Sequence, residues 1–468
     1  MFKLKIKYLS FFFGIVSILS FFNILYSYYF NLYLNLDTYY YTLVTSFVLF
    51  LVLFKFGKYD FKSNIFDKIL TIFLGYLLIP LVLSIPFYFS IYNLTFSNSF
   101  FEAISGFTST GFTVFDNIKL VDQSLIIWRS STQWIGGLYF LFSIIYLIDI
   151  YDDSFKKTLT NFISFNSSEI LKQASKVFIL YTLLTILIFI ILNIFSIRTF
   201  DSLNLALTII SSGGFLPVNE LSTIIKENAQ IIIFSLLMLF SFFSLFFSYN
   251  LIFLRKKNVN FFYEDLHLFI YLIVVTTIFF LFFSFNYDFF INLFAIISSM
   301  TNIGFSLSSG QENLNFIYLI LVIIGGSFFS TSSGLRFIKI YSLFKFSLNQ
   351  ILSFSRPKNV FMNKLIFTKI NFNLVEINKY FLTIIIFILS LFILTSLLSL
   401  SGITFVNSFK LAILTLMNTV NSSIYGLKEF DFYNLQLFSK YCLIFFMIVG
   451  RIELLTILLL IRKFLFKN

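Results

Sequence analysis

Long apolar segments alternate with short amphipathic stretches over most of this chain. Segments near twenty residues long with few charges recur, a length at which a helix crosses the hydrocarbon core of a bilayer. The predicted spans are roughly 9–30, 38–54, 69–92, 125–148, 177–197, 230–254, 268–286, 315–346, 380–402 and 436–461. The pattern therefore predicts an all-α membrane protein with about ten spans.

Between spans, four amphipathic stretches are too short to cross the bilayer and end in a small or polar turn. They are 99–113, 201–217, 288–306 and 407–421, and the first three contain the pairs Gly111-Phe112, Gly214-Phe215 and Gly304-Phe305. Backbone that dips into a membrane is tolerated where it is buried in protein or lines a water-filled passage. The stretches predict four pseudo-repeated helix–pore loop–helix units around a central pore; ordinary outer loops are the alternative.

The repeats divide the chain into five parts. We expect an N-terminal transmembrane hairpin (1–56), a first span–pore–span repeat (57–160), a second (161–258), a third with a broken gating helix (259–354), and a cytoplasmic link with the fourth repeat (355–468). The first and fourth dips align without gaps, because Ser99, Phe100, Ala103, Ile104 and Thr110 face Ser408, Phe409, Ala412, Ile413 and Thr419.

Charge is sparse and unevenly distributed. The chain of 468 residues is 59% hydrophobic and 12% charged, with a formal net charge of +12. Basic residues cluster in alternate loops and at both ends, as in Lys3, Lys5, Lys7, Lys156, Lys157, Arg255, Lys256, Arg462 and Lys463. The positive-inside rule then places both termini of a multi-pass membrane protein in the cytoplasm, and the distribution argues against nucleic acid as a partner. The opposite loops are richer in acids, which would concentrate cations outside.

Catalytic and metal-binding chemistry is poorly represented. Cys442 and His267 are the single cysteine and histidine, so a disulfide within the chain and a histidine metal cluster are excluded. Glu102, Asp116 and Asp122 come nearest to an acidic site, and a solvated vestibule explains them equally well. We expect no enzyme; a non-transport membrane assembly protein is a distant alternative.

Backbone carbonyl oxygens can replace the hydration shell of a cation without a fixed charge. A turn that aims them inward needs unusual φ/ψ angles, which glycine tolerates, and the preceding half-helix aims its dipole at the pore. The candidate ion-filter residues, with K⁺ as the bound ion, are Thr110, Gly111, Gly213, Gly214, Ile303, Gly304, Thr419, Val420 and Asn421.

Two further segments are candidates for a gate. Small residues interrupt the eighth span at Gly325, Gly326, Ser327, Ser330, Thr331, Ser332, Ser333 and Gly334, followed by Arg336 and Lys339. This segment predicts either a broken helix that blocks the pore or tight helix packing through small residues. Arg451 lies deep in the last span, where an unpaired charge is costly. It is either an electrostatic gate, a partner in an ion pair, or a side chain that reaches the inner interface.

These residues resemble the Trk/Ktr/HKT superfamily of potassium transporters from about residue 69 to the end. The similar motifs are FEAISGFTSTGF (101–112), RSSTQWIGG (129–137), the Gly/Ser segment with Arg336 and Lys339, and GRIEL (450–454). The N-terminal hairpin favours the bacterial Trk-type membrane subunit. The resemblance implies potassium uptake by a homodimer whose subunits each contain a pore, gated by a separate cytosolic nucleotide-binding regulatory subunit.

The family's filter glycines correspond to Gly111, Gly214 and Gly304, but the fourth copy departs. Val420, Asn421 or Gly426 takes the glycine position, depending on the alignment. A β-branched residue adopts a left-handed φ poorly. This corner leaves a sodium-permeable or K⁺/Na⁺-coupled transporter as the alternative function.

Overall fold

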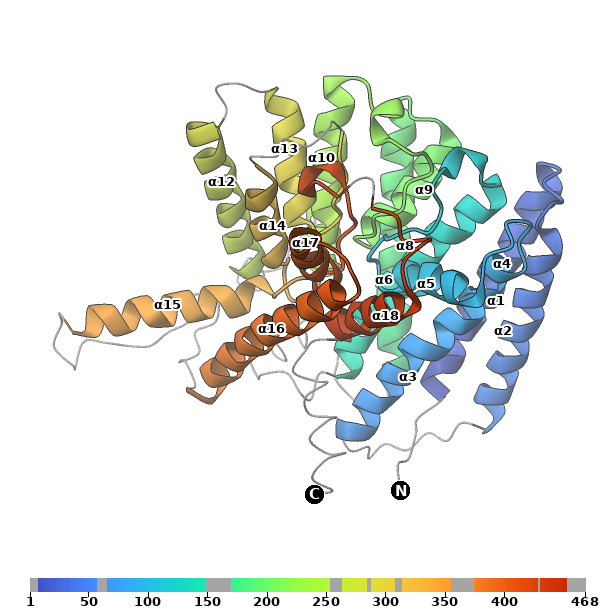
Figure 1. The fold of residues 1–468 in the computed structure, drawn as a ribbon, viewed down its shortest axis with the longest axis horizontal. Helices are drawn as coiled ribbons and strands as arrows, with labels where there is room; N and C mark the ends of the chain where they lie inside the picture. The colour runs from blue at the N-terminus through green and yellow to red at the C-terminus, as the bar shows by residue number, and fades with distance from the viewer. Residues whose placement is uncertain are drawn as a thin grey trace.

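A computed structural model describes residues 7–56, 65–147, 170–252, 263–283, 288–307, 314–354, 374–427 and 430–452. In these ranges the chain forms helices joined by turns. The N-terminal hairpin, α1 (Lys7–Tyr29) and α2 (Leu36–Phe56), lies at one edge of the molecule in Figure 1. Glu453 and most of the predicted cytoplasmic link (355–373) lie outside the described residues.

The remaining helices fall into four successive groups. In the first are α3 (Ile65–Leu83), α4 (Ile85–Tyr88), α5 (Phe96–Phe107) and α6 (Gln123–Tyr146). The second comprises α8 (Ile170–Ile194), α9 (Thr199–Ile210), α10 (Asn228–Phe242) and α11 (Leu245–Ile252). The third comprises α12 (Tyr263–Phe283), α13 (Phe289–Met300), α14 (Asn315–Ile323) and α15 (Phe337–Ser353), and the fourth α16 (Leu374–Leu400), α17 (Phe405–Leu416) and α18 (Leu437–Ile452).

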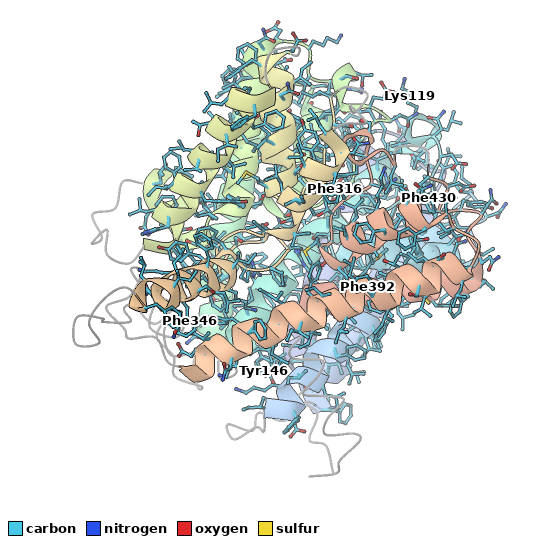
Figure 2. All side chains as sticks on the ribbon, turned by 60° about the vertical axis from the view of Figure 1, so that its left-hand side comes forward. Lys119, Tyr146, Phe316, Phe346, Phe392 and Phe430 are labelled. Atoms are coloured by element: carbon cyan, nitrogen blue, oxygen red, sulfur yellow. The ribbon has the colours of Figure 1, made fainter. Side chains whose placement is uncertain are left out.

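Outer helices carry the apolar surface expected of a membrane protein. Six described helices are long and apolar enough to cross a bilayer: Tyr8–Tyr29, Leu36–Phe56, Ile65–Tyr88, Gln173–Ile194, Glu264–Phe282 and Glu376–Leu400. Phe316 and Phe392, labelled in Figure 2 on α14 and α16, are 62% and 60% exposed. Large apolar side chains left exposed in this way fit a lipid environment rather than water. By contrast, α6 is buried along nearly its whole length.

Three predicted spans are interrupted. The span at 69–92 breaks at Ser84 between α3 and α4, and the span at 315–346 breaks after Ile323. Residues 324–336 form a loop before α15, which we call the intramembrane loop because it interrupts a predicted span. Neither the break at Ser84 nor the third break, between α10 and α11, was predicted. Ser244 stands there, and its backbone N–H and hydroxyl both donate to the carboxylate of Asp265 at 2.8 Å. These bonds replace helical ones, so the helix can stop without leaving the Ser244 N–H unsatisfied.

Candidate functional site

The four short helices α5, α9, α13 and α17 contain twelve residues each and end in the same backbone conformation. After a C-cap residue, each chain enters the left-handed region, at Ser109 (φ 56°), Ser212 (56°), Asn302 (59°) and Asn418 (46°). In three copies the next N–H closes a Schellman-type bond of 2.9 Å, from Thr110 to Ser105, from Gly213 to Thr208, and from Thr419 to Leu414. The repeat is thus a backbone motif, which serine fills twice and asparagine twice.

The left-handed residues fix the register of what we call the re-entrant turns (109–112, 212–215, 302–305 and 418–421). Two positions after them stand Gly111, Gly214, Gly304 and Val420. Val420, rather than Asn421 or Gly426, therefore takes the glycine position of the fourth turn. Gly111 and Gly304 have φ values of +82° and +80°. Gly214 and Val420 are not among the described residues with positive φ, so the left-handed glycine expected at each turn occurs at two.

These four positions meet. A methyl group built on Gly111 would lie 2.8 Å from the Cα of Gly214 and 3.0 Å from the Cβ of Val420. One built on Gly304 would lie 2.9 Å from Cγ1 of Val420, and one built on Gly214 would overlap its Cβ. Since non-bonded carbon atoms pack at about 3.5–4.0 Å, the three glycines have no room for a side chain. The valine side chain fills the space that they leave.

Side chains of the left-handed residues connect each turn to the next. In the second to fourth copies the donors and acceptors are Ser212 Oγ to Thr301 O (2.9 Å), Asn302 Nδ2 to Thr419 Oγ1 (3.3 Å) and Asn418 Nδ2 to Thr110 Oγ1 (3.0 Å). The hydroxyl groups of Thr110 and Thr419, two of the candidate ion-filter residues, therefore join neighbouring turns. Gly213 packs closely against Gln133, because a methyl group on this glycine would overlap the Gln133 side chain. Ile303 is fully buried.

A cavity of about 770 Å³ opens above the turns. Gly111, Gly214, Gly304 and Val420 contribute to its lining, as does Asn421, and its acidic lining residues are Asp116, Glu220 and Asp431. Burial alone would raise the pKa of Asp431, but hydrogen bonds from Asn434 and from the Tyr433 N–H hold that pKa below its ordinary value. Asp431 therefore remains ionised at neutral pH.

Glu102 does not belong to this vestibule, which corrects the sequence-based interpretation. Its carboxylate is fully buried and accepts a hydrogen bond from Arg129 Nε at 2.8 Å. The same carboxylate accepts from the Val114 N–H at 2.8 Å and from the Thr113 hydroxyl at 3.1 Å. The Arg129 guanidinium also lies 4.2 Å from the ring centroid of Phe215. This pair therefore holds the chain just after the first turn against the second.

The intramembrane loop (324–336) contacts the turns from another direction. The Thr331 hydroxyl donates to Ile210 O at 2.7 Å, and the Ser332 hydroxyl donates to Asn302 Oδ1 at 2.7 Å. Gly334 has φ +79°, and a methyl group on Gly325 would overlap the carbonyl oxygen of Ser333. The helix is thus broken here, with its small residues in tight backbone contacts. The segment also includes Gly326, Ser327 and Ser330, all buried.

The two basic residues after the loop are both buried. Arg336 Nη1 donates to the carbonyl oxygens of Ser327 and Ser332 at 3.0 Å each, so its charge is bound within the loop. Lys339 lies in the first turn of α15, 7% exposed.

The loop also contacts the unpredicted break between α10 and α11. The Ser327 N–H donates to Phe242 O at 3.0 Å, and the Leu245 N–H donates to Phe329 O at 2.9 Å. From α12, Glu264 Oε1 accepts from the Phe328 N–H at 2.8 Å. Two interrupted helices therefore exchange the backbone bonds that each lacks internally.

Arg451 lies where these parts meet. It is 1% exposed, donates to the Ser333 hydroxyl, and reaches Ser109 Oγ at 3.4 Å and Ser211 O at 3.5 Å. Its guanidinium carbon lies 4.1 Å from the ring centroid of Phe140. A buried cation among uncharged oxygens and an aromatic face does not match a side chain that reaches the interface. Arg451 thus connects the loop with the first and second turns.

Comparison with known proteins agrees with this architecture. The crystal structure of the potassium transporter TrkH from Vibrio parahaemolyticus superposes with a TM-score of 0.83 at 19% identity, covering 100% of both chains. The Trk system potassium uptake protein TrkH of Salmonella typhimurium is 25% identical over 425 residues, 86% of each chain. An uncharacterized cation transporter of Methanocaldococcus jannaschii is 26% identical over 307 residues, 62% of this chain and 61% of that protein. No family model matches the chain.

The chain is a homologue of the Trk potassium uptake proteins. This confirms the resemblance drawn from the motifs at 101–112, 129–137 and 450–454, and it confirms the all-α membrane fold. As a Trk homologue it has relatives that are transporters rather than enzymes.

Sequence reasoning missed the left-handed Ser/Asn positions, the Glu102–Arg129 pair and the breaks at Ser84 and Ser244. A signal existed for the first, since Ser or Asn precedes each of Gly111, Gly214, Gly304 and Val420 by two residues. The pair Glu102–Arg129 was visible only as two charges in apolar surroundings.

Proposed function

We propose that this protein takes up potassium across the cell (inner) membrane through a filter lined by the carbonyl oxygens of the four re-entrant turns. The observation that carries the proposal is the meeting of Gly111, Gly214, Gly304 and Val420 at the lining of an acid-bearing cavity. Four backbone segments that converge with no side chain on three of them bring peptide oxygens within reach of one ion.

Each part of the pathway has a physical role in this proposal. Asp116, Glu220 and Asp431 raise the local cation concentration in the outer cavity. The C-terminal ends of α5, α9, α13 and α17 lead into the turns, so the negative ends of four helix dipoles favour a cation there. Filter residues are Thr110, Gly111, Gly213, Gly214, Ile303, Gly304, Thr419, Val420 and Asn421, and K⁺ is the substrate.

The gate consists of the intramembrane loop and Arg451. The loop is bonded to the second and third short-helix ends through Thr331 and Ser332, and the Arg451 guanidinium contacts Ser333 of the same loop. A loop held across the pathway blocks an ion sterically, and a buried positive charge beside the turns repels it. Movement of the loop away from Asn302 would then open the pathway.

Partners and orientation belong to the proposal as well. We propose a homodimer in the lipid bilayer with both termini cytoplasmic, regulated by a separate cytosolic nucleotide-binding subunit. The five-part division at 56, 160, 258 and 354 is consistent with the four helix groups.

Growth of a host that lacks its own potassium uptake systems tests the function. The wild-type gene should restore growth at low external potassium. Gly111→Arg should not, because no side chain fits beside Gly214 and Val420. Equal growth of both strains, with equal membrane levels of the two proteins, would overturn the filter assignment.

A further inference from the structure

We infer that Gln133 is a positioning residue of the ion pathway. Its side-chain oxygen holds the peptide group between Gly214 and Phe215 so that the Gly214 carbonyl oxygen is directed at the passing ion. The inference rests on the proposed function and deepens it, because it names the group that orients one of the four turns. It also gives a role to the motif at 129–137, which lies in α6 rather than in a turn.

One face of α6 follows the second turn. Arg129, Gln133 and Gly137 are four residues apart and therefore share that face. A methyl group built on Gly137 would lie 2.9 Å from the Cα of Ser211, at the end of α9. Gln133 Oε1 accepts from the Phe215 N–H at 3.2 Å, and the Arg129 guanidinium lies 4.2 Å from the Phe215 ring centroid. The second turn is thus held against α6 along its length.

The bond from Phe215 fixes the direction of the preceding carbonyl group. In a planar trans peptide group the N–H and the C=O point in opposite directions. The Phe215 N–H points at Gln133, so the Gly214 carbonyl oxygen is directed away from α6. Gln133 is fully buried and does not contribute to the lining of the outer cavity, whereas Gly214 and Phe215 do. Gln133 therefore contacts the turn from within the protein, opposite the side on which we place the ion.

Gly213 makes room for this contact. A methyl group on Gly213 would overlap both Oε1 and Cδ of Gln133. Gly213 is not among the described residues with positive φ, so its backbone conformation does not by itself require glycine. The equivalent positions of the other turns carry the β-branched residues Thr110, Ile303 and Thr419. The glycine at 213 is therefore explained by the glutamine that packs on it.

The amide of Gln133 uses its oxygen and not its nitrogen. Among the residues that the structure describes, none accepts a hydrogen bond from Nε2, although this atom is buried. The site consequently requires an acceptor for the Phe215 N–H, and a carboxyl group of the same length would also supply one.

Rb⁺ uptake into proteoliposomes that contain equal amounts of full-length protein tests the inference. Gln133→Leu fills similar space without an acceptor, so the Phe215 N–H loses its partner in the native orientation. We expect the maximal uptake rate to fall on the order of tenfold, the effect of one unsatisfied buried donor. Gln133→Glu keeps an acceptor oxygen and should stay near the wild-type rate.

Ser130→Ala is the matched control. The Ser130 hydroxyl donates to Asn204 Oδ1 at 2.7 Å, a buried bond between α6 and α9 that does not involve the turn. Its loss weakens the packing of the same two helices and should leave the uptake rate near that of the wild type.

Gly213→Ala breaks the same bond from the side of the turn and should lower uptake as Gln133→Leu does. In Gln133→Ala the oxygen is already absent, so adding Gly213→Ala should cause little further loss, as expected for two residues that act through one contact.

Four results would overturn the inference. They are wild-type uptake in Gln133→Leu, an equal loss in Ser130→Ala, a loss in Gln133→Glu as large as that in Gln133→Leu, and additive losses in the double variant. Each of these leaves the proposed function standing, because the wild type still carries Rb⁺. Wild-type protein that takes up no more Rb⁺ than protein-free vesicles would overturn the proposed function and the inference with it.

Discussion

The carboxylate of Glu102 and the guanidinium of Arg129 form an ion pair of 2.8 Å with both side chains almost fully buried. Glu102 belongs to α5, and Arg129 belongs to α6. Because Glu102 also accepts from the Val114 N–H, the pair ties these two helices to the chain just after the first re-entrant turn. This single buried ion pair thus helps to fix the position of the first turn.

Removing one partner of this pair should destabilise the protein strongly. Glu102→Gln leaves the Arg129 charge buried and uncompensated, which costs about 3–5 kcal/mol. Thermal unfolding in detergent should show a melting temperature for Glu102→Gln well below that of the wild type. Asp116 is an exposed acid in the connection between α5 and α6. Asp116→Asn should change the free energy of unfolding by less than about 0.5 kcal/mol. Equal melting temperatures for the two variants would show that the pair contributes little.

Neutralising Arg451 should increase cation flux. Arg451→Gln removes a buried positive charge beside Ser109 and Ser211, and with it the repulsion of a passing cation. We expect Rb⁺ flux to rise on the order of tenfold, as ~1.4 kcal/mol of like-charge repulsion implies. Arg451→Lys keeps the charge and should stay near wild type, and so should Arg198→Gln, an exposed arginine. Flux in Arg451→Gln at or below that of Arg451→Lys would rule out the electrostatic gate.

The outer acids should act on apparent affinity and respond to salt. Asp431→Asn removes one cavity charge and should raise the KM for Rb⁺ about twofold at low ionic strength, with little change at high salt because of screening. The lowered pKa of Asp431 gives the sign of the pH effect. Its charge is present above that pKa and is lost only as pH falls through it. The difference between wild type and Asp431→Asn should therefore be constant from pH 7 to pH 5; a difference that disappears in this range would contradict the assignment.

Weakening the bond between the loop and the third turn should favour the open state. Ser332→Ala removes the hydroxyl that donates to Asn302, whereas Ser330→Ala removes one that donates to Ser327 within the loop. A lost hydrogen bond of about 1 kcal/mol gives an increase of roughly fivefold in the open population for Ser332→Ala. Single-channel or flux recordings should show this increase for Ser332→Ala alone. The same increase in both variants would mean that the hydrogen bond from Ser332 to Asn302 is not what holds the loop closed.

Much of the architecture could be predicted from the sequence because membrane insertion imposes strong patterns. The four short dips and the interrupted eighth span follow from hydropathy and from small residues in an apolar segment. The break at Ser244 could not be predicted, because it depends on Asp265, which comes from another helix and is distant in sequence. Nothing in the local residues distinguishes it from a continuous span.

The positions of the four turns could be predicted, but not their backbone conformation. Glycine after three of the four short helices indicated where the turns lie, yet the left-handed residues are Ser109, Ser212, Asn302 and Asn418. Serine has no strong local preference for that conformation, so tertiary bonds such as Ser212 to Thr301 select it. The same reasoning applies to Val420, whose place in the register became clear only from the backbone.

The most direct test of the central claim is Rb⁺ uptake into proteoliposomes at a defined, inside-negative membrane potential. Two glycines with positive φ provide a matched pair: a methyl group on Gly304 would lie 2.9 Å from Thr419 Cγ2, whereas one on Gly402 meets nothing within 4 Å. If the four turns form the ion pathway, wild type and Gly402→Ala should both take up Rb⁺, and Gly304→Ala should lose most of that uptake. Equal uptake by Gly304→Ala and Gly402→Ala would contradict the account.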